Sequence, residues 1–337
     1  MPVLNLSQFG MTLAGATIAA VISAILIIVL RPLLLRYAMA RPNARSSHTI
    51  PTPQGGGIAV ITATVATSAA GFTFLGGPAP GTWLVLVAAI FLAMVGMADD
   101  LRTVPVTPRL LMQTATIAAV LVALPVEMRI APWAPWWLER AMLLVATLWF
   151  VNLVNFMDGL DWMTVAEMVP ILAALTIIGL CGDLPGAQTI VAIALCGALL
   201  GFAPFNRPVA RLFLGDVGSL PIGLLVGWLL ITLASLHFVA ALLLPLYYVA
   251  DATLTLIRRQ LAGEKVWIAH RSHFYQRATD NGFSVLEVVT RVLVLNILLC
   301  VLAAASILWH SLTADAVFLI LGCAAVTALL VHFSRRC

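Results

Sequence analysis

Several carboxylates in this sequence stand where apolar runs end. Asp99 and Asp100 close one such run, and Asp216 opens another between two glycines. A charge at such a position is costly unless it is paired or faces an aqueous cleft, which makes each of these residues a functional candidate. Adjacent carboxylates also repel each other unless a cation or a proton relieves them. One member of the Asp99–Asp100 pair would then bind a divalent metal while the other accepts a proton. The alternative is that the pair contacts Arg102 at the membrane surface.

Four polar residues follow one another at intervals of three: Asn152, Asn155, Asp158 and Asp161. In a continuous α-helix this spacing spreads them over about 180° of the surface, so they converge only where the helix ends or tightens. Gly159 permits such a break, and a broken helix at membrane depth is tolerated where it lines a cavity. The pattern therefore predicts a polar cavity, with a polar ladder between packed helices as the alternative.

The glycines around Asp216 suit an anion as well as a turn. With Gly215 and Gly218 on either side, backbone N–H groups can approach a phosphate closely. Asn206 precedes this segment, and Ser219 follows it in a position to cap the next helix. A turn without a ligand has the same composition, so this segment indicates a phosphate site only in combination with others.

Basic and imidazole side chains gather in two polar segments. Arginine binds phosphate in a planar fork, and histidine can donate or accept a proton near neutral pH. No cysteine or third histidine stands close enough for a zinc site. We expect these segments to face phosphates, with a positive loop resting on anionic lipid as the alternative. The residues concerned are Arg45 and His48 in residues 35–55, and His270, Arg271 and His273 in residues 258–285.

The elements that must position these groups are membrane-spanning helices. The chain of 337 residues is 62% hydrophobic and only 9% charged, whereas a soluble domain is about 25% charged. Disorder is excluded because it requires low hydrophobicity and high charge. The apolar runs are continuous rather than alternating, which argues against a β-barrel. We expect an all-α polytopic integral membrane protein with about 10–11 transmembrane helices of about 20 residues each, one of them near 239–257.

Basic residues set the orientation of these helices. With the N-terminus on the periplasmic side and eleven spans, all but two of the 18 basic residues, Arg129 and Arg140, fall on the inner side, as the positive-inside rule requires. Three tryptophans in the outer segment 126–139 predict an interfacial aromatic belt. The chain is then a single transmembrane domain over 1–337, with cytoplasmic loops at about 35–55, 99–108, 155–163, 205–218 and 258–285.

Together, the polar segments combine carboxylates, amides, imidazoles and guanidinium groups at one membrane face. Carboxylates hold Mg²⁺ together with substrate phosphates, and basic residues neutralise phosphate oxygens. A reaction that requires both beside lipid is phosphoryl transfer to a lipid acceptor.

Five segments, in this order, resemble the polyprenyl-phosphate N-acetylhexosamine-1-phosphate transferase superfamily, glycosyltransferase family 4. They are ArgSerSerHis…ProThrProGlnGlyGlyGly, AspAsp, AsnLeuValAsnPheMetAspGlyLeuAsp, PheLeuGlyAspValGlySer and HisArgSerHis. The stretch HisArgSerHisPheTyrGln looks most like the branch that starts O-antigen and related surface polysaccharides. The pentapeptide transferases carry three consecutive histidines there, which this chain lacks, and a lysine where this chain has Arg102.

The resemblance implies a single transferase domain and a defined reaction. The phosphate of undecaprenyl phosphate attacks the β-phosphorus of a UDP-N-acetylamino sugar, UMP leaves, and a lipid-linked sugar diphosphate forms in the inner leaflet. The donor would be UDP-GlcNAc or a deoxy analogue such as UDP-FucNAc or UDP-QuiNAc. The product would start O-antigen synthesis for lipopolysaccharide. Mg²⁺ is the expected cofactor, with Mn²⁺ as an alternative, and single displacement is favoured over an aspartyl intermediate.

The resemblance also assigns roles to residues. Asp216 is the principal metal ligand with Asn155 assisting, and Asp99 deprotonates or positions the lipid phosphate with support from Asp100. Asp158 joins the catalytic group in a supporting role. The remaining expected site residues are His270 and His273 in the catalytic group, and Asp161, Asn206, Phe213, Arg271, Arg45, His48 and Asn152 in substrate binding.

Two other functions remain open from the sequence. A phospho-MurNAc-pentapeptide transferase of peptidoglycan synthesis is the alternative within the superfamily. A secondary transporter is the alternative from another class, although transporters place polar groups near the bilayer midplane in matched halves, and no halves match here. The expected location is the bacterial inner membrane. The expected partners are the UDP-sugar, undecaprenyl phosphate and membrane lipid, with no nucleic acid, and a homodimer is left open.

Overall fold

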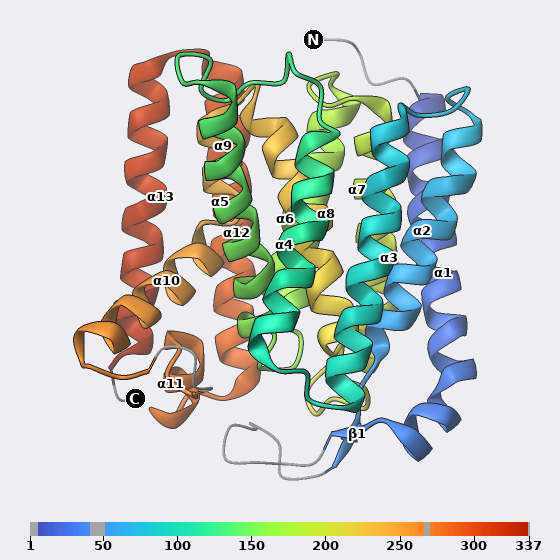
Figure 1. Cartoon of the computed structure of the whole chain (residues 1–337). Coiled ribbons are helices and arrows are strands. Elements are labelled where there is room, and N and C mark those ends of the chain that lie inside the picture. Colours follow the sequence, from blue (N-terminus) through green and yellow to red (C-terminus); the bar gives the residue numbers. More distant parts are fainter. Residues whose placement is uncertain (1–5, 41–50, 266–269, 336–337) are drawn as a thin grey trace.

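The computed structural model describes residues 6–40, 51–265 and 270–335 as a bundle of helices (Figure 1). Two strands of two residues each, β1 (Met39–Ala40) and β2 (Thr52–Pro53), pair antiparallel at one end of the bundle. The helices are α1 (Leu6–Tyr37), α2 (Gly56–Thr73), α3 (Pro80–Leu101), α4 (Val106–Val122), α5 (Trp136–Met157), α6 (Met163–Leu180), α7 (Gly186–Phe202), α8 (Asp216–Ala234), α9 (Phe238–Leu243), α10 (Leu246–Leu261), α11 (Phe274–Asp280), α12 (Val285–Trp309) and α13 (Leu312–Phe333), with a 3-10 turn η1 (Ala203–Phe205).

In the described part of the chain, nine helices are long and apolar enough to cross a membrane. A tenth, α4, is apolar but has 17 residues, which at about 1.5 Å per residue reach about 25 Å. The predicted all-α polytopic architecture is therefore confirmed, and the chain is a multi-pass membrane protein.

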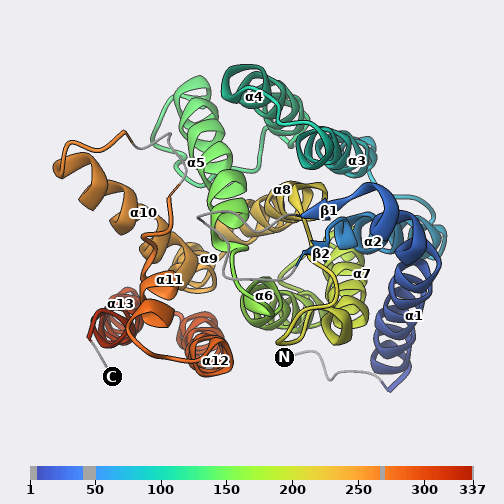
Figure 2. The same cartoon turned by 90° about the horizontal axis from the view of Figure 1, so that it is seen from below.

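One predicted span, 239–257, is not a single helix. Helix α9 ends at Leu243, and a separate helix, α10, begins after Pro245. Proline has no backbone N–H, so it cannot continue the hydrogen bonds of the preceding helix. Helix α10 buries Tyr248 and Asp251 on one face, while Leu254 is exposed on another. It slants out of the bundle (Figures 1 and 2). Helix α10 therefore has a buried face with polar side chains and an exposed apolar face, unlike a uniformly apolar membrane span.

Helix α8 is the centre of the bundle and is buried along nearly its whole length. Glycines allow its neighbours to approach closely at its first turn. A Cβ added to Gly57 of α2 would lie 2.2 Å from the Gly218 Cα, and one added to Gly96 of α3 would lie 2.2 Å from the Asp216 carbonyl oxygen. The residues around Asp216 are thus held by backbone contacts from two sides.

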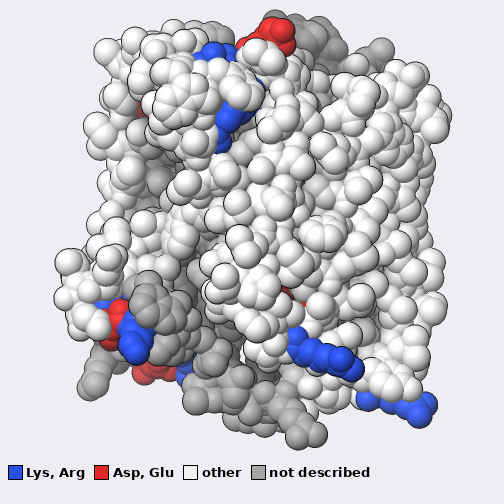
Figure 3. All heavy atoms as spheres, viewed as in Figure 1, with Lys and Arg blue, Asp and Glu red and all other residues white. Residues whose placement is uncertain are grey.

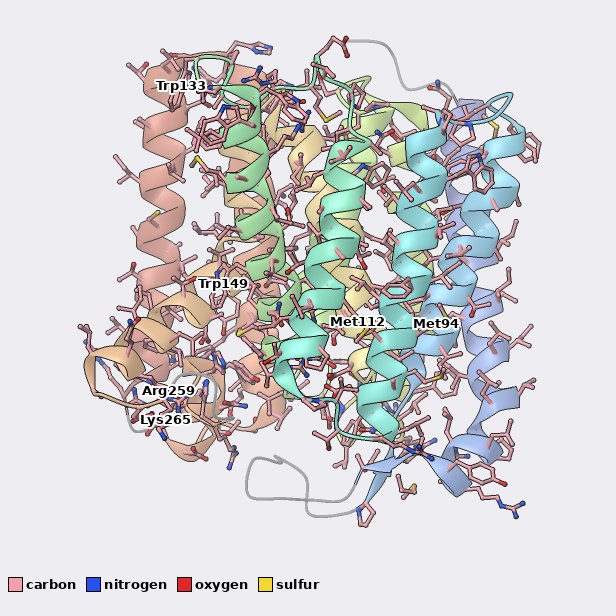
Figure 4. All side chains as sticks on the ribbon, viewed as in Figure 1. Met94, Met112, Trp133, Trp149, Arg259 and Lys265 are labelled. Carbon is pink, nitrogen blue, oxygen red and sulfur yellow. The ribbon has the colours of Figure 1, made fainter. Side chains whose placement is uncertain are left out.

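The two ends of the bundle differ in character. Trp133 lies at one end, and Arg259 and Lys265 lie at the other (Figure 4). In the view of Figure 3, charged side chains gather towards these ends and a broad uncharged belt separates them. The arrangement agrees with a membrane-embedded belt between two polar faces.

Candidate active site

The first turn of α8 is capped by a residue from α3. Asp100 accepts hydrogen bonds from the backbone N–H of Asp216 at Oδ1 and from that of Val217 at Oδ2, each at 3.1 Å. Gly215, with φ of 77°, makes the turn into the helix, a backbone conformation that favours glycine. Helix N-termini leave such N–H groups without intrahelical partners, so the Asp100 carboxylate satisfies two of them. Asp100 therefore fixes Asp216 in place.

The Asp216 carboxylate faces α5. Asn155 donates from Nδ2 to Asp216 Oδ1 at 2.7 Å and to Ser219 Oγ at 2.9 Å. The Asp216 side chain is 26% exposed, so it is accessible to a ligand despite its place at the end of a buried helix. The structure thus brings together the two residues predicted to hold a metal.

Asp99 and Asp216 share a guanidinium group. Arg109 of α4 forms an ion pair with Asp99 through Nη1, and the same nitrogen lies 3.6 Å from Asp216 Oδ2. Asp99 also accepts from the backbone N–H of Val104 at 2.7 Å. The charge pattern predicts Arg109 only as one of the basic residues on the inner side. Arg109 is the only charged residue of α4 and stands in its first turn. This position could have indicated a site role, because a charged side chain within a membrane helix is normally paired with an opposite charge.

The donor set of this cluster fits a divalent cation. The Asp99 and Asp216 carboxylates share one guanidinium, and the Asp100 carboxylate lies at the same helix start, so the cluster has excess negative charge. Within the described ranges, no group of three or more Asp, Glu, His or Cys side chains forms a ready metal cage. Mg²⁺ commonly binds one or two protein carboxylates and takes its remaining oxygens from phosphates and water. Asp216 and Asn155 would supply the protein oxygens of such a site, and the substrate phosphates and water would supply the others.

Asp158 lies just beyond the end of α5 and is bonded to the first turn of α6. It accepts a hydrogen bond from Thr164 Oγ1 at 2.5 Å. Burial raises the pKa of Asp158 to about 7, and the nearby charges of Asp100 and Asp161 act in the same direction. The carboxyl group can therefore exist in either protonation state near neutral pH, next to the carboxylate cluster.

The loop before Phe213 is fastened to the turn between α5 and α6. Asp161 Oδ2 accepts from the backbone N–H of Ala210 at 2.9 Å. Asn206 accepts from the Trp162 backbone N–H at 2.8 Å and donates to the Leu212 carbonyl at 3.0 Å. Both predicted substrate-binding side chains are buried and act on the loop backbone.

The segment after β2 runs beside the same loop. The backbone N–H groups of Gly55 and Gly56 donate to the Phe213 carbonyl, and the Phe213 N–H donates to the Pro53 carbonyl at 2.9 Å. Gln54 Nε2 donates to the Asp100 carbonyl at 2.9 Å. The predicted first and fourth polar segments therefore meet next to Asp100. Arg45 and His48 lie outside the described residues.

The predicted histidine segment leads into α11. His270 Nδ1 lies 2.9 Å from Ser272 Oγ, and Arg271 Nη2 lies 3.3 Å from Asp280 Oδ1. Burial lowers the pKa of His270 to about 4, with His273 as the next cause. Tyr275 OH donates to the Phe156 carbonyl at 3.0 Å, which seats α11 on the end of α5, one residue after Asn155.

Asn152 lies elsewhere. It donates from Nδ2 to Gln113 Oε1 of α4 and to the Leu148 carbonyl, each at 2.8 Å. Helix α5 continues to Met157, so the three-residue spacing carries Asn152 away from Asn155. Its contacts hold α4 against α5.

Comparison with known proteins shows which family the sequence resembles. Residues 82–234 match the family described as glycosyl transferase family 4. A decaprenyl-phosphate N-acetylglucosaminephosphotransferase of Mycobacterium tuberculosis is 29% identical, over 89% of this chain and 83% of its own length. The chain is therefore similar to glycosyl transferase family 4 over its central part. The superfamily inferred from the five segments is confirmed.

Two further relatives within this family are similar over most of their length. A probable undecaprenyl-phosphate N-acetylglucosaminyl 1-phosphate transferase of Bacillus subtilis is 25% identical over 79% of this chain and 78% of its own length. A phospho-N-acetylmuramoyl-pentapeptide-transferase of Lactiplantibacillus plantarum is 26% identical, with 77% and 88% covered. These relatives support a transferase.

Proposed function

We propose that this family 4 glycosyltransferase moves an N-acetylamino-sugar 1-phosphate from a UDP-sugar to undecaprenyl phosphate and releases UMP. The observation that carries the proposal is the cluster of Asp99, Arg109, Asn155 and Asp216 at one end of the bundle. The names of the relatives support it, since they describe transfer of an amino sugar phosphate to a polyprenyl phosphate.

Mg²⁺ held by Asp216 and Asn155 would neutralise charge on the diphosphate of the donor. Both groups stand on rigid helices, and Asp100 keeps Asp216 at the start of α8. Mn²⁺ has the same oxygen-ligand preference and is an alternative.

The reaction proposed is a single displacement. An oxygen of the lipid phosphate forms a bond to the β-phosphorus of the donor, and the bond from that phosphorus to the bridging oxygen breaks, so that UMP leaves with the bond electrons. Asp99 accepts a proton from the lipid phosphate or orients it. Arg109 provides a positive charge next to the reacting phosphates, where a guanidinium can bind phosphate oxygens in two places.

The nucleotide is proposed to lie against Phe213. Asp161 and Asn206 have their polar groups on backbone atoms of the preceding loop, so they act by fixing that loop. His270 and Arg271 lie on the connection before α11, which contacts the end of α5, and they are proposed to face the diphosphate and the sugar.

The active-site end is proposed to face the cytoplasm of a bacterial inner membrane. It is the end that carries Arg259 and Lys265, and the excess of basic residues on cytoplasmic loops is the usual determinant of orientation. The UDP-sugar would then be drawn from the cytoplasm and the acceptor from the inner leaflet.

The pathway proposed is initiation of a surface polysaccharide such as O-antigen. Its support is the HisArgSerHisPheTyrGln stretch at 270–276, whereas relatives of the pentapeptide transferase type are also similar to the chain.

Surface polysaccharide initiation and peptidoglycan synthesis differ in the nucleotide sugar that donates the sugar phosphate. Purified protein should therefore be incubated with undecaprenyl phosphate, Mg²⁺ and, separately, UDP-GlcNAc, UDP-FucNAc, UDP-QuiNAc and UDP-MurNAc-pentapeptide.

UMP release with one of the three amino-sugar nucleotides is the expected result. Release with UDP-MurNAc-pentapeptide alone would assign the chain to peptidoglycan synthesis. No UMP from any of the four donors would contradict the transferase proposal and favour a transporter.

A further inference from the structure

We infer that Tyr275 is a positioning residue, whose buried hydroxyl fixes the last turn of α5 and thereby holds Asn155 in the cation site. The inference rests on the proposed function and adds to it a residue of the histidine segment that has no assigned role. It links α11, which follows that segment, to the carboxylate cluster at the start of α8.

The position of Asn155 depends on how α5 ends. Its Nδ2 atom donates to Asp216 Oδ1 at 2.7 Å and to Ser219 Oγ at 2.9 Å, so its side-chain oxygen is the atom that would bind a cation. Asn155 lies in the last turn of α5, which ends at Met157. The last four carbonyl groups of a helix have no donor within the helix. Contacts from other elements are therefore needed to keep this turn in place.

The Tyr275 hydroxyl supplies such a contact. It donates to the Phe156 carbonyl at 3.0 Å, and Phe156 is the residue that directly follows Asn155. Tyr275 is fully buried, and a buried tyrosine hydroxyl normally requires a hydrogen-bond partner. Here that partner is the end of α5, so Tyr275 and the last turn of α5 fix each other.

Gly159 leaves the space that this hydroxyl occupies. A Cβ added to Gly159 would lie 2.1 Å from the Tyr275 hydroxyl oxygen and 3.1 Å from Tyr275 Cζ. The sequence indicates Gly159 as a residue that permits the helix to break, and its surroundings add a second reason for glycine, since any side chain would displace the hydroxyl. Tyr275 therefore contacts the chain on both sides of Asp158, at Phe156 and at Gly159.

Tyr275 is itself held from α10. Its backbone N–H donates to Asp251 Oδ2 at 3.1 Å, and the backbone N–H of Phe274 donates to Asp251 Oδ1 at 3.0 Å. These are the first two N–H groups of α11, which have no acceptor within their own helix. Asp251 is fully buried. The start of α11 is therefore fixed on α10, and the Tyr275 side chain extends from there to α5.

The residue before α11 strengthens this attachment. The His273 side chain accepts from the backbone N–H of Gln276, and the Gln276 side chain accepts from that of His273, which is the reciprocal arrangement of a capping box. The His273 ring also stacks on the Tyr275 ring, with centroids 5.7 Å apart and planes at 21°. Both rings are buried, so the tyrosine ring has little freedom to swing away from α5.

Helix α10 is anchored in the bundle core. Glu167 of α6 is buried, accepts from Asn296 Nδ2 of α12 at 2.5 Å, and accepts from the backbone N–H of Tyr248 at 3.4 Å. Asp251 lies about one helical turn further along α10. Contacts from α6 through α10 and α11 thus support the end of α5.

The test measures cation binding as well as activity. Tyr275→Phe removes the hydroxyl and keeps the ring. We expect the dissociation constant of Mn²⁺, measured by electron paramagnetic resonance on the purified protein, to rise by about tenfold, the scale of losing a group that orients a metal ligand. The Mg²⁺ concentration needed for half-maximal UMP release should rise by a similar factor, while kcat at saturating Mg²⁺ changes by less than about twofold.

Tyr247→Phe is the matched control, because it removes another buried tyrosine hydroxyl, whose hydrogen bond goes to Asp251 and not to α5. It should keep the wild-type Mn²⁺ affinity and Mg²⁺ requirement, even where its Tm in detergent falls as much as that of Tyr275→Phe. A merely structural role for Tyr275 would instead leave both variants with the same Mn²⁺ affinity.

A second experiment tests the contact without substrate or cation. Gly159→Ala should lower the Tm, because the added methyl group meets the Tyr275 hydroxyl. Combining Gly159→Ala with Tyr275→Phe should lower the Tm by less than the sum of the two single losses, as expected for residues in contact. Gly159→Ala should also raise the Mg²⁺ requirement, so it replaces Tyr275→Phe in the first experiment if that variant does not fold.

An unchanged Mn²⁺ affinity and Mg²⁺ requirement in Tyr275→Phe would overturn the inference, as would equal changes in Tyr275→Phe and Tyr247→Phe. Additive losses of Tm in the double variant would disprove the contact. Absence of UMP release by the wild type with every donor would instead contradict the proposed function, so the two failures are distinguishable.

Discussion

Asp100 and Asp216 are joined across two helices: the Asp100 carboxylate at the end of α3 accepts the backbone N–H of Asp216 at the start of α8. Its neighbour Asp99 is instead paired with Arg109. The two adjacent carboxylates that the sequence presents as one pair thus have different tasks. Asp100 holds the first turn of α8, and Asp99 pairs with the cation that also lies near Asp216.

Replacement of Asp100 should therefore affect stability as well as activity. Asp100→Ala removes the cap of α8, which typically costs about 1 kcal/mol, and releases Asp216 from its position. We expect a lower Tm in detergent and a higher Mg²⁺ requirement for UMP release. Asp100→Asn keeps an acceptor oxygen and should be milder in both measurements. An Asp100→Ala protein with wild-type Tm would contradict the capping role.

Replacement of Arg109 should reduce turnover without unfolding the protein. Arg109→Ala leaves Asp99 and Asp216 without their shared cation and removes the proposed phosphate contact. We expect kcat to fall by about tenfold or more, as for the loss of a charged hydrogen-bond donor to a reacting group, with partial recovery in Arg109→Lys. Arg102→Ala is the control, since Arg102 is exposed and should keep wild-type kcat. Equal losses for the Arg102 and Arg109 variants would count against a specific role.

The close approach of α2 to α8 gives a prediction about packing. Gly57→Ala would place a methyl group 2.2 Å from the Gly218 Cα, and overpacking of this kind costs about 1–3 kcal/mol. Gly10→Ala is the matched control, because nothing lies within 4 Å of its added Cβ. Thermal unfolding should show a lower Tm for Gly57→Ala only. A Gly57→Ala protein that is as stable as Gly10→Ala would disprove the contact.

His270 should make stability depend on acid pH. Burial lowers its pKa to about 4, below the ordinary value of about 6.5 that it regains on unfolding. The folded protein then binds fewer protons than the unfolded protein between pH 6.5 and 4, so this residue causes stability to fall as the pH falls through that window. The Tm of the wild type should decline more steeply than that of His270→Gln below pH 6.5, and the two curves should run parallel above pH 7. Identical pH dependence at pH 5 would contradict the lowered pKa.

The ends of helices near the site were predictable because the local sequence determines where a helix begins or ends. Gly159 indicated that a helix ends there, and α5 does end at Met157. The glycines around Asp216 indicated a turn into a helix, which the structure confirms at Gly215. The Leu and Val runs predicted the spanning helices for the same reason, since apolar length alone makes a membrane helix.

Contacts between helices were less predictable, because sequence spacing does not show which faces meet. Asn152 was grouped with Asn155, yet its partner is Gln113 on α4. Arg109 was counted for orientation, although it bridges two carboxylates. Asp251 was hidden in a run that was read as one span, because the break at Pro245 was not recognised.

The central proposal is that Asp216 holds a divalent cation for transfer of a sugar phosphate to undecaprenyl phosphate. The most direct measurement is UMP release by purified wild type and Asp216→Asn protein, with Mg²⁺ and with EDTA. We predict release by the wild type in Mg²⁺, restored after EDTA when Mg²⁺ is added back, and none by Asp216→Asn in either condition. Wild-type rates in Asp216→Asn, or release that persists in EDTA, would contradict the account.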